Sequence, residues 1–356
     1  MGDGSRLRLI WIVPLAFGAF VLAPGAALAH ERWFVPKEEQ RPTDWGALVS
    51  LSVLLALVSG AACVAFLAWL QRRIGDPLWP RPPFFQRLEP AAPAILGVQT
   101  AIAIIFAASR LNLFVPNIEL PHNAVGAGVA GLAVVAAFSF ITGVLTRVGA
   151  LLTAALFVAA FGFAEHPEEV VEQVIFVGIA FYLVAVGRGV VRYNHRAEED
   201  RTDLTDRLFP FALPVLRICA GVSVLVLGFT EKLLNVELGV AFLHEYPRFN
   251  VAREVGIDWF TDHRFVYAIG IVEVTAGCAL LAGFLPRLVI LALWIPFNLG
   301  IAFLPPQELI GHLPILSTMY VLLVRGTVGV PPREVAPIAA SDQRPAAAHA
   351  ARGAMG

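Results

Sequence analysis

One acidic residue in an apolar stretch is the first candidate for chemistry in this sequence. Glu273 lies within the apolar run from Phe265 to Gly283, about 12 Å along a helix that rises 1.5 Å per residue. A carboxylate inside such a helix is costly unless it is paired or protonated. Lys232, Arg217 and His312 are candidate partners. The pattern fits either a buried ion pair that fixes helix packing or a proton acceptor in a relay site.

A second set of residues could bind a metal ion. Glu308 and His312 are four residues apart at the start of a predicted helix, and Glu168 and Glu172 have the same spacing, so each pair lies on one helix face. Imidazole and amine ligands suit copper or zinc. The alternative is a polar rim in which acids complement helix dipoles and histidines suit the interface. The candidate metal ligands are His30, His166, Glu168, Glu172, His263, Glu308 and His312.

Composition limits the class of protein to which this chain can belong. Of its 356 residues, 58% are hydrophobic and only 15% are charged, which is typical of a polytopic membrane protein whose partner is the lipid bilayer. The formal net charge of -1 argues against a nucleic-acid partner. Cys63, Cys219 and Cys278 form no CxxC pair, so we expect them to pack in the core.

The N-terminus predicts a cleaved secretory signal. Arg6 and Arg8 precede the apolar run from Leu9 to Leu22, and Ala27-Leu28-Ala29 forms an A-x-A cleavage site. The run is shorter than the about 17 to 25 residues of a spanning helix, which favours cleavage over retention as an anchor. Cleavage after Ala29 would make His30 the first residue of the mature chain, with an amine and an imidazole that could chelate a metal ion.

Nine further apolar runs predict nine membrane-spanning helices. Arginines follow the first, third, fifth, seventh and ninth runs, so these loops are expected in the cytoplasm and the mature N-terminus outside it. We therefore expect a multi-pass protein of a bacterial-type inner membrane. The runs are Leu48 to Leu70, Ala91 to Ala108, Ala124 to Gly143, Val148 to Phe163, Val170 to Gly187, Pro210 to Phe229, Phe265 to Gly283, Leu288 to Leu304 and Leu309 to Val324.

The chain also contains an internal repeat. The stretch "ITGVLTRVGALLTAALFVAAFGFAEHPEE" resembles "LAGFLPRLVILALWIPFNLGIAFLPPQEL", with a constant separation of 140 residues. Each unit contains four predicted spans, so both enter the membrane from the same side and the repeats are parallel. The expected fold is all-α, with one extra helix and two four-helix bundles. The matched pairs are Gly143 and Gly283, Leu145 and Leu285, Arg147 and Arg287, Phe163 and Phe303, and Glu168 and Glu308.

The second unit resembles a known family. "VLRICAGVSVLVLGFTEKLLN" followed by "GIVEVTAGCALLAGFLPR" is similar to the DoxX family of four-helix membrane proteins. The resemblance covers about a third of the chain, and the first unit resembles the family only as a degenerate copy, with "FAASRLN" in place of "GFTEKLL". It implies an association with membrane redox chemistry. The residues that fall on the family pattern are Arg217, Gly228, Glu231, Lys232, Glu273, Gly283 and Arg287.

The resulting division of the chain has seven parts. We expect a signal peptide over 1–29, an external segment over 30–47, a transmembrane helix and cytoplasmic loop over 48–90, a degenerate DoxX-like repeat over 91–190, a cytoplasmic linker over 191–208, a DoxX-like repeat over 209–326 and a disordered cytoplasmic tail over 327–356.

Three classes of function remain open. A subunit of a quinone-linked oxidoreductase would use Glu273, Lys232 and Arg217 as catalytic residues, with electrons from a redox partner protein. Glu231 and Asn298 are its candidate cofactor-binding residues, although Asn298 also suits a helix–helix hydrogen bond. A metal-handling protein would use the external histidines, and a scaffold would use the bundles only to hold partners.

Overall fold

All regular elements that the structure describes are helices. The computed structural model describes residues 32, 35, 41–188, 203–301 and 306–326, and leaves the side chains of 203, 251 and 295–308 undescribed. The all-α expectation is confirmed for these residues. The predicted signal peptide, His30, most of the predicted linker and the predicted tail lie outside them.

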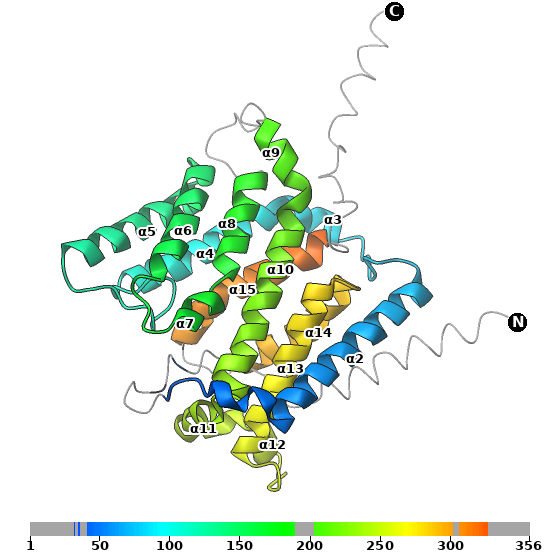
Figure 1. Ribbon diagram of the computed structural model, residues 1–356. Helices are drawn as coiled ribbons and strands as arrows, with labels where there is room; N and C mark the ends of the chain where they lie inside the picture. The colour runs from blue at the N-terminus through cyan, green and yellow to red at the C-terminus, as the bar shows by residue number, and fades with distance from the viewer. Residues whose placement is uncertain (1–31, 33–34, 36–40, 189–202, 302–305, 327–356) are drawn as a thin grey trace, which may run out of the picture.

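Thirteen helices of the described residues form the main part of the fold (Figure 1). They are α2 (Leu51–Ile74), α4 (Ala92–Ala108), α5 (Ala124–Thr142), α6 (Thr146–Ala160), α7 (Pro167–Glu172), α8 (Ile175–Val186), α10 (Ala212–Leu227), the π-helix η6 (Gly228–Leu233), α11 (Val236–Glu245), α12 (Val251–Glu254), α13 (Asp262–Ala282), α14 (Pro286–Ile301) and α15 (Pro306–Arg325). Short helices complete them: α3 (Phe85–Leu88), α9 (Asp203–Leu208), η3 (Trp45–Val49), η4 (Glu89–Ala91), η5 (Phe209–Phe211) and η7 (Pro247–Phe249).

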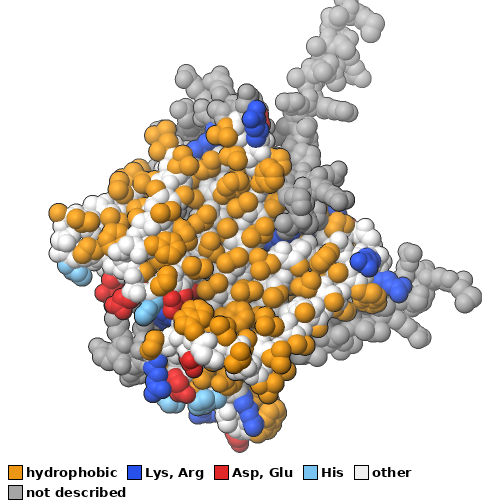
Figure 2. Space-filling model, in the orientation of Figure 1, with side chains coloured by type: hydrophobic (Ala, Val, Ile, Leu, Met, Phe, Trp, Pro, Cys, Tyr) orange, Lys and Arg blue, Asp and Glu red, His pale blue; other side chains and the backbone are white. Residues whose placement is uncertain are grey.

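The helices are apolar enough for an integral membrane protein. Within the described residues, five are long and apolar enough to cross a bilayer: Leu51–Ile74, Phe85–Ala108, Ala124–Thr142, Leu204–Leu233 and Asp262–Ala282. Apolar side chains such as Val135 and Phe138 lie exposed, and Figure 2 shows a broad hydrophobic surface over these helices, with charged side chains gathered toward its edges. Such a surface fits contact with lipid.

The fifth predicted span differs from the expectation. The run from Val170 to Gly187 is not one helix, because α7 ends at Glu172 and α8 begins at Ile175. Between them the amides of Gln173 and Val174 donate to carbonyls three residues earlier, which tightens the backbone and breaks the α-helical ladder. The break places Glu172 and Gln173 at the junction of two helices.

The backbone repeats itself at the separation found in the sequence. Gly143 and Gly283 end α5 and α13 in the left-handed conformation, with φ of 77° and 69°. Leu145 and Leu285 follow with φ of 51° and 45°, which is unusual for leucine.

The arginine two residues after each leucine makes the same contact. Arg147 donates to the carbonyl of Val184 at 3.0 Å, and Arg287 donates to that of Val324 at 2.7 Å. Both arginines and both acceptors are 140 residues apart, so the two units share one helix corner and the way it is tied to the last helix.

The two units pack against each other through one shared core. Helix α8 of the first unit packs on α10 of the second, and α15 of the second packs on α4 of the first, so the same elements meet in exchanged roles. A single hydrophobic cluster includes Leu96, Ile179, Leu216 and Leu322 from both units. The units are therefore halves of one core and not two separate bundles. Helix α2, outside the repeat, packs along α13 of the second unit.

Candidate functional site

The site is built where α10 continues into the π-helix η6 and meets α13. Small residues let the two helices approach closely, because a Cβ added to Gly228 would lie 2.9 Å from the Cβ of Glu273, and one added to Gly270 would lie 3.0 Å from the Cβ of Lys232. π-helices occur mostly as short insertions, often at functional sites. Here η6 buries Thr230, Glu231 and Lys232 side by side.

A lysine joins two carboxylates inside the protein. The Nζ atom of Lys232 lies 3.5 Å from Glu273 and 3.8 Å from Glu231, and none of the three side chains is more than 2% exposed. The expected pairing of Glu273 with Lys232 is present. Burial of a charged pair is costly unless further polar contacts support it, so the groups around this pair matter to its state.

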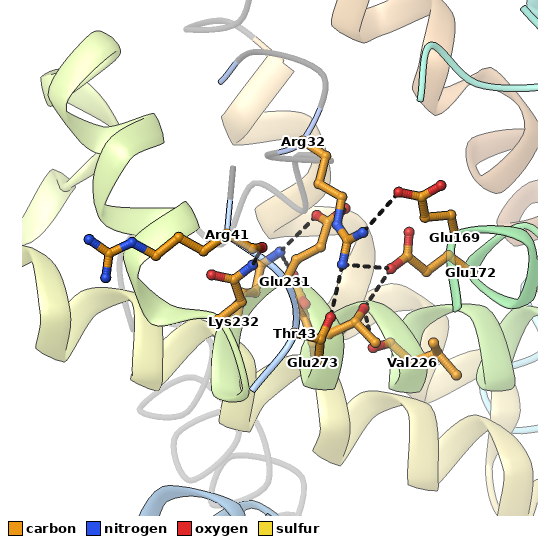
Figure 3. A network of polar contacts seen from close by, with 11 residues as sticks. Arg32, Arg41, Thr43, Glu169, Glu172, Val226, Glu231, Lys232 and Glu273 are labelled. Atoms are coloured by element: carbon orange, nitrogen blue, oxygen red, sulfur yellow. Dashed lines mark hydrogen bonds and ion pairs between the residues drawn. The ribbon is translucent and has the colours of Figure 1, made fainter. Parts of the chain in front are cut away.

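Arg32 connects this pair to the first unit (Figure 3). Its guanidinium lies 3.2 Å from Glu169, 3.8 Å from Glu172 and 3.9 Å from Glu231, and it also donates to the hydroxyl of Thr43 at 3.2 Å. The first two glutamates belong to α7 and the third to η6. A residue outside both repeat units thus lies between acids of the two.

The charges around Arg32 change its protonation equilibrium and that of Glu169. Burial disfavours the charged guanidinium, but Glu172, Glu231 and Glu169 outweigh it and raise the pKa of Arg32. Burial raises the pKa of Glu169, although Arg32 acts in the opposite direction. Arg32 therefore stays charged while Glu169 holds its proton more tightly than an exposed glutamate.

Hydroxyl groups of the second unit hold Glu172 of the first. Thr230 donates to the carboxylate of Glu172 at 2.6 Å, and Ser223 donates to its backbone carbonyl. Glu172 is 1% exposed. Together with Lys232 and Arg32, the four acids Glu169, Glu172, Glu231 and Glu273 form what we call the acid network.

The acid network contains more acids than bases. Among the described residues, its four carboxylates face two cations, Arg32 and Lys232, and all six groups are buried. Like charges at short range in a buried site disfavour full ionisation. The arrangement is suited to holding at least one proton.

A cavity of about 50 Å³ adjoins the network between the two units. Its polar lining comes from Glu273, His312, Gln173 and Ser223, and its aromatic lining from Phe114 and Phe176. The two rings pack with centroids 4.4 Å apart. The cavity brings His312 and Glu273 to the same space, from α15 and α13.

Other predicted site residues lie apart from the network. Arg217 packs against Gly283 at the opposite end of α13, and about 15 residues of α10 and η6, or roughly 22 Å, separate it from Lys232. The structure therefore does not bring Arg217 to Glu273. The sequence could not exclude that contact, because both residues lie on helices expected to be neighbours.

The predicted metal ligands whose side chains the structure describes do not form one cluster. His263 pairs at 3.4 Å with Glu237 on the surface, and His166 is exposed at the start of α7. Glu168 is half-buried on α7, and His312 lines the cavity. Within the described part of the chain, no group of three or more His, Cys, Asp or Glu side chains could hold a metal ion.

Three predicted residues lie outside what the structure describes. His30 precedes the described segment, and the side chains of Asn298 and Glu308 are undescribed although their helices, α14 and α15, are placed.

Sequence reasoning missed Arg32, Glu169 and Gln173 as site residues. The signals available were an arginine three residues after the predicted cleavage site, an acid directly before an apolar run and an amide inside that run. Compared with protein-family models, curated proteins and solved structures, the chain has no match, so its site is interpreted from its own geometry.

Proposed function

We propose that this chain is an integral membrane protein that acts as an accessory, proton-carrying subunit of a quinone-linked membrane redox system. The observation that carries the proposal is the pairing of Glu273 with Lys232 in the acid network, beside the cavity between the two units. Reduction of a quinone consumes two protons, and a buried carboxylate connected to further acids can store and supply them.

The quinone ring itself is not assigned to the cavity. A volume of about 50 Å³ is smaller than a ring requires, whereas it accommodates water. We therefore assign proton transfer to Glu273 and Lys232. A redox partner protein would supply the electrons, and the quinone ring would bind to that partner or at its interface with this chain. Glu231 belongs to the same network through Lys232 and Arg32.

The resemblance of the second unit to the DoxX family supports the redox context of this proposal. The polar residues that carry the resemblance on η6 and α13, namely Glu231, Lys232 and Glu273, are those that the fold brings together. Copper or zinc binding receives no comparable support from the described residues.

Infrared spectroscopy of the full chain in lipid nanodiscs tests the proposal. We expect the carbonyl stretching band of a protonated carboxyl at neutral pH, lost in Glu273→Gln and retained in Glu237→Gln, an exposed acid on α11. Addition and chemical reduction of a short-tailed quinone should shift this band. A spectrum that is identical in the wild type and Glu273→Gln would refute the assignment of the proton to Glu273.

A further inference from the structure

The cavity between the two units contains a polar group that the network does not use. Gln173 is 3% exposed and lines the cavity, and its side-chain Nε2 has no hydrogen-bond partner among the described residues. A buried amide donor without a partner destabilises the folded protein. A hydrogen-bond acceptor inside the cavity would remove this destabilisation.

The dimensions of the cavity identify the class of molecule that fits. A water molecule needs roughly 10 to 15 Å³ of such volume and two to four polar partners. The cavity has about 50 Å³, and Glu273, His312 and Ser223 supply polar atoms in addition to Gln173. The remaining lining is apolar, with Phe114 and Phe176 on one side. The space therefore suits a few water molecules held at its polar groups.

The cavity also connects groups that exchange protons. Glu273 comes from α13 and faces Lys232 of η6 at 3.5 Å. Lys232 also faces Glu231 of η6, which contacts Arg32 of the N-terminal segment, and Arg32 in turn contacts Glu172 of α7. The cavity is also lined by His312 of α15 and by Gln173 from the junction of α7 and α8. Water in this space would join a carboxylate and an imidazole that belong to different helices.

We propose that the cavity binds a small cluster of water molecules that conducts protons between Glu273 and His312, and that Gln173 is the residue that positions it. In one transfer, the Glu273 carboxyl gives its proton to the nearest water, each water of the cluster passes a proton to the next, and the last water gives a proton to an imidazole nitrogen of His312, which leaves a carboxylate and an imidazolium. No electrons move, and the water is regenerated. This inference rests on the proposed function, because it specifies how the proton on Glu273 is exchanged.

The test measures how fast the Glu273 band responds to a pH jump in the full chain in nanodiscs. Gln173→Leu, which is apolar and of similar size, should slow the change about tenfold while its final amplitude is kept, since tenfold corresponds to about 1.4 kcal/mol in the barrier. Gln173→Asn, which keeps an amide, should recover most of the rate.

A matched control is available on α15. Thr318 is fully buried, its hydroxyl has no hydrogen-bond partner among the described residues, and it does not line the cavity. Thr318→Val therefore removes a buried polar group without altering the water site, and it should leave the rate unchanged.

The outcomes separate this inference from the proposed function. A wild-type protein without a band that depends on Glu273 would overturn the proposed function. A normal band whose rate is the same in Gln173→Leu would overturn the water path alone. If Gln173→Leu folds poorly, the infrared spectrum of the wild type tests the inference instead. We expect an O–H stretching band of internal water that shifts in heavy-oxygen water and is lost in His312→Phe. The absence of this band would contradict the inference.

Discussion

The two repeat units keep the same corner but differ in what they bury beside it. In both, a glycine and a leucine in the left-handed conformation lead to an arginine that binds a carbonyl of the last helix. Ten residues before the glycine, the first unit has Ala133, 1% exposed, and the second has Glu273, also 1% exposed. One copy is a scaffold at this position, and the other contains a carboxylate.

A basic residue follows the same division. In the second unit Lys232 is buried between Glu231 and Glu273. In the first unit, Arg110 at the end of the corresponding helix lies exposed, with its guanidinium 3.7 Å from the centre of the Phe106 ring. The repeated fold is therefore maintained by backbone corners and apolar packing, so polar groups can be concentrated in one repeat unit.

Placing the acid of the second unit into the first should have the largest effect. Ala133→Glu would bury a carboxylate on α5. The first unit has the exposed Arg110 where the second has the buried Lys232, so the new carboxylate would lack that cation. We therefore expect a loss of about 4 kcal/mol in the free energy of unfolding. Unfolding in mixed detergent micelles, followed by circular dichroism, measures it. Ala133→Ser serves as a control of similar size, and equal stability of the two variants would contradict the comparison.

Removal of the lysine should be the next most damaging change. Lys232→Met leaves Glu231 and Glu273 buried without their shared cation, which should cost about 3 kcal/mol. Because the proposed proton leaves Glu273 neutral, the uncompensated charge is that of Glu231, so the double variant Lys232→Met with Glu231→Gln should regain more than half of the loss. The same unfolding assay checks both, and a double variant less stable than the single one would argue against this explanation.

The two equivalent arginines should differ in importance. Arg287 is buried and donates to the carbonyls of Leu78, Pro80 and Val324, whereas Arg147 is only half-buried. We expect Arg287→Ala to cost about 2 kcal/mol and Arg147→Ala about 1 kcal/mol, since hydrogen bonds from charged groups contribute more when buried. Thermal unfolding of the matched pair of variants measures the difference, and equal losses would show that burial is not the cause.

The smallest expected effect is a pH dependence that belongs to the first unit. Because burial raises the pKa of Glu169 above its ordinary value of 4.5, its contribution to stability is complete below that pH and is lost as pH rises through the folded-state pKa.

The amide in Glu169→Gln does not titrate and can still accept from Arg32, so its melting temperature should rise relative to that of the wild type between acidic and neutral pH, by about 2 °C. Melting curves across this range test the sign. A melting temperature of the variant minus that of the wild type that falls as pH rises would contradict the raised pKa.

Much of the fold was predictable because hydrophobic stretches determine helices locally. Each predicted apolar run overlaps a helix, and the "GVLTR" and "GFLPR" corners recur with the same backbone conformation. The number of spans, the cleavage of the signal and the orientation in the membrane stay predictions, since the structure shows helices and not a bilayer. The pairing of Glu273 with Lys232 followed from two polar residues on helices expected to be neighbours.

The sequence by itself determined the helical class, the positions of the apolar helices and the duplication, since these depend on composition and on periodic local pattern. Only the tertiary structure decided that Arg32 meets acids of both units, that Arg217 lies far from Glu273, and that Gln173 and His312 face one cavity. The physical reason is that these contacts depend on how the units pack across their shared core. Residues 137 positions apart, such as Arg32 and Glu169, meet only once that packing is complete.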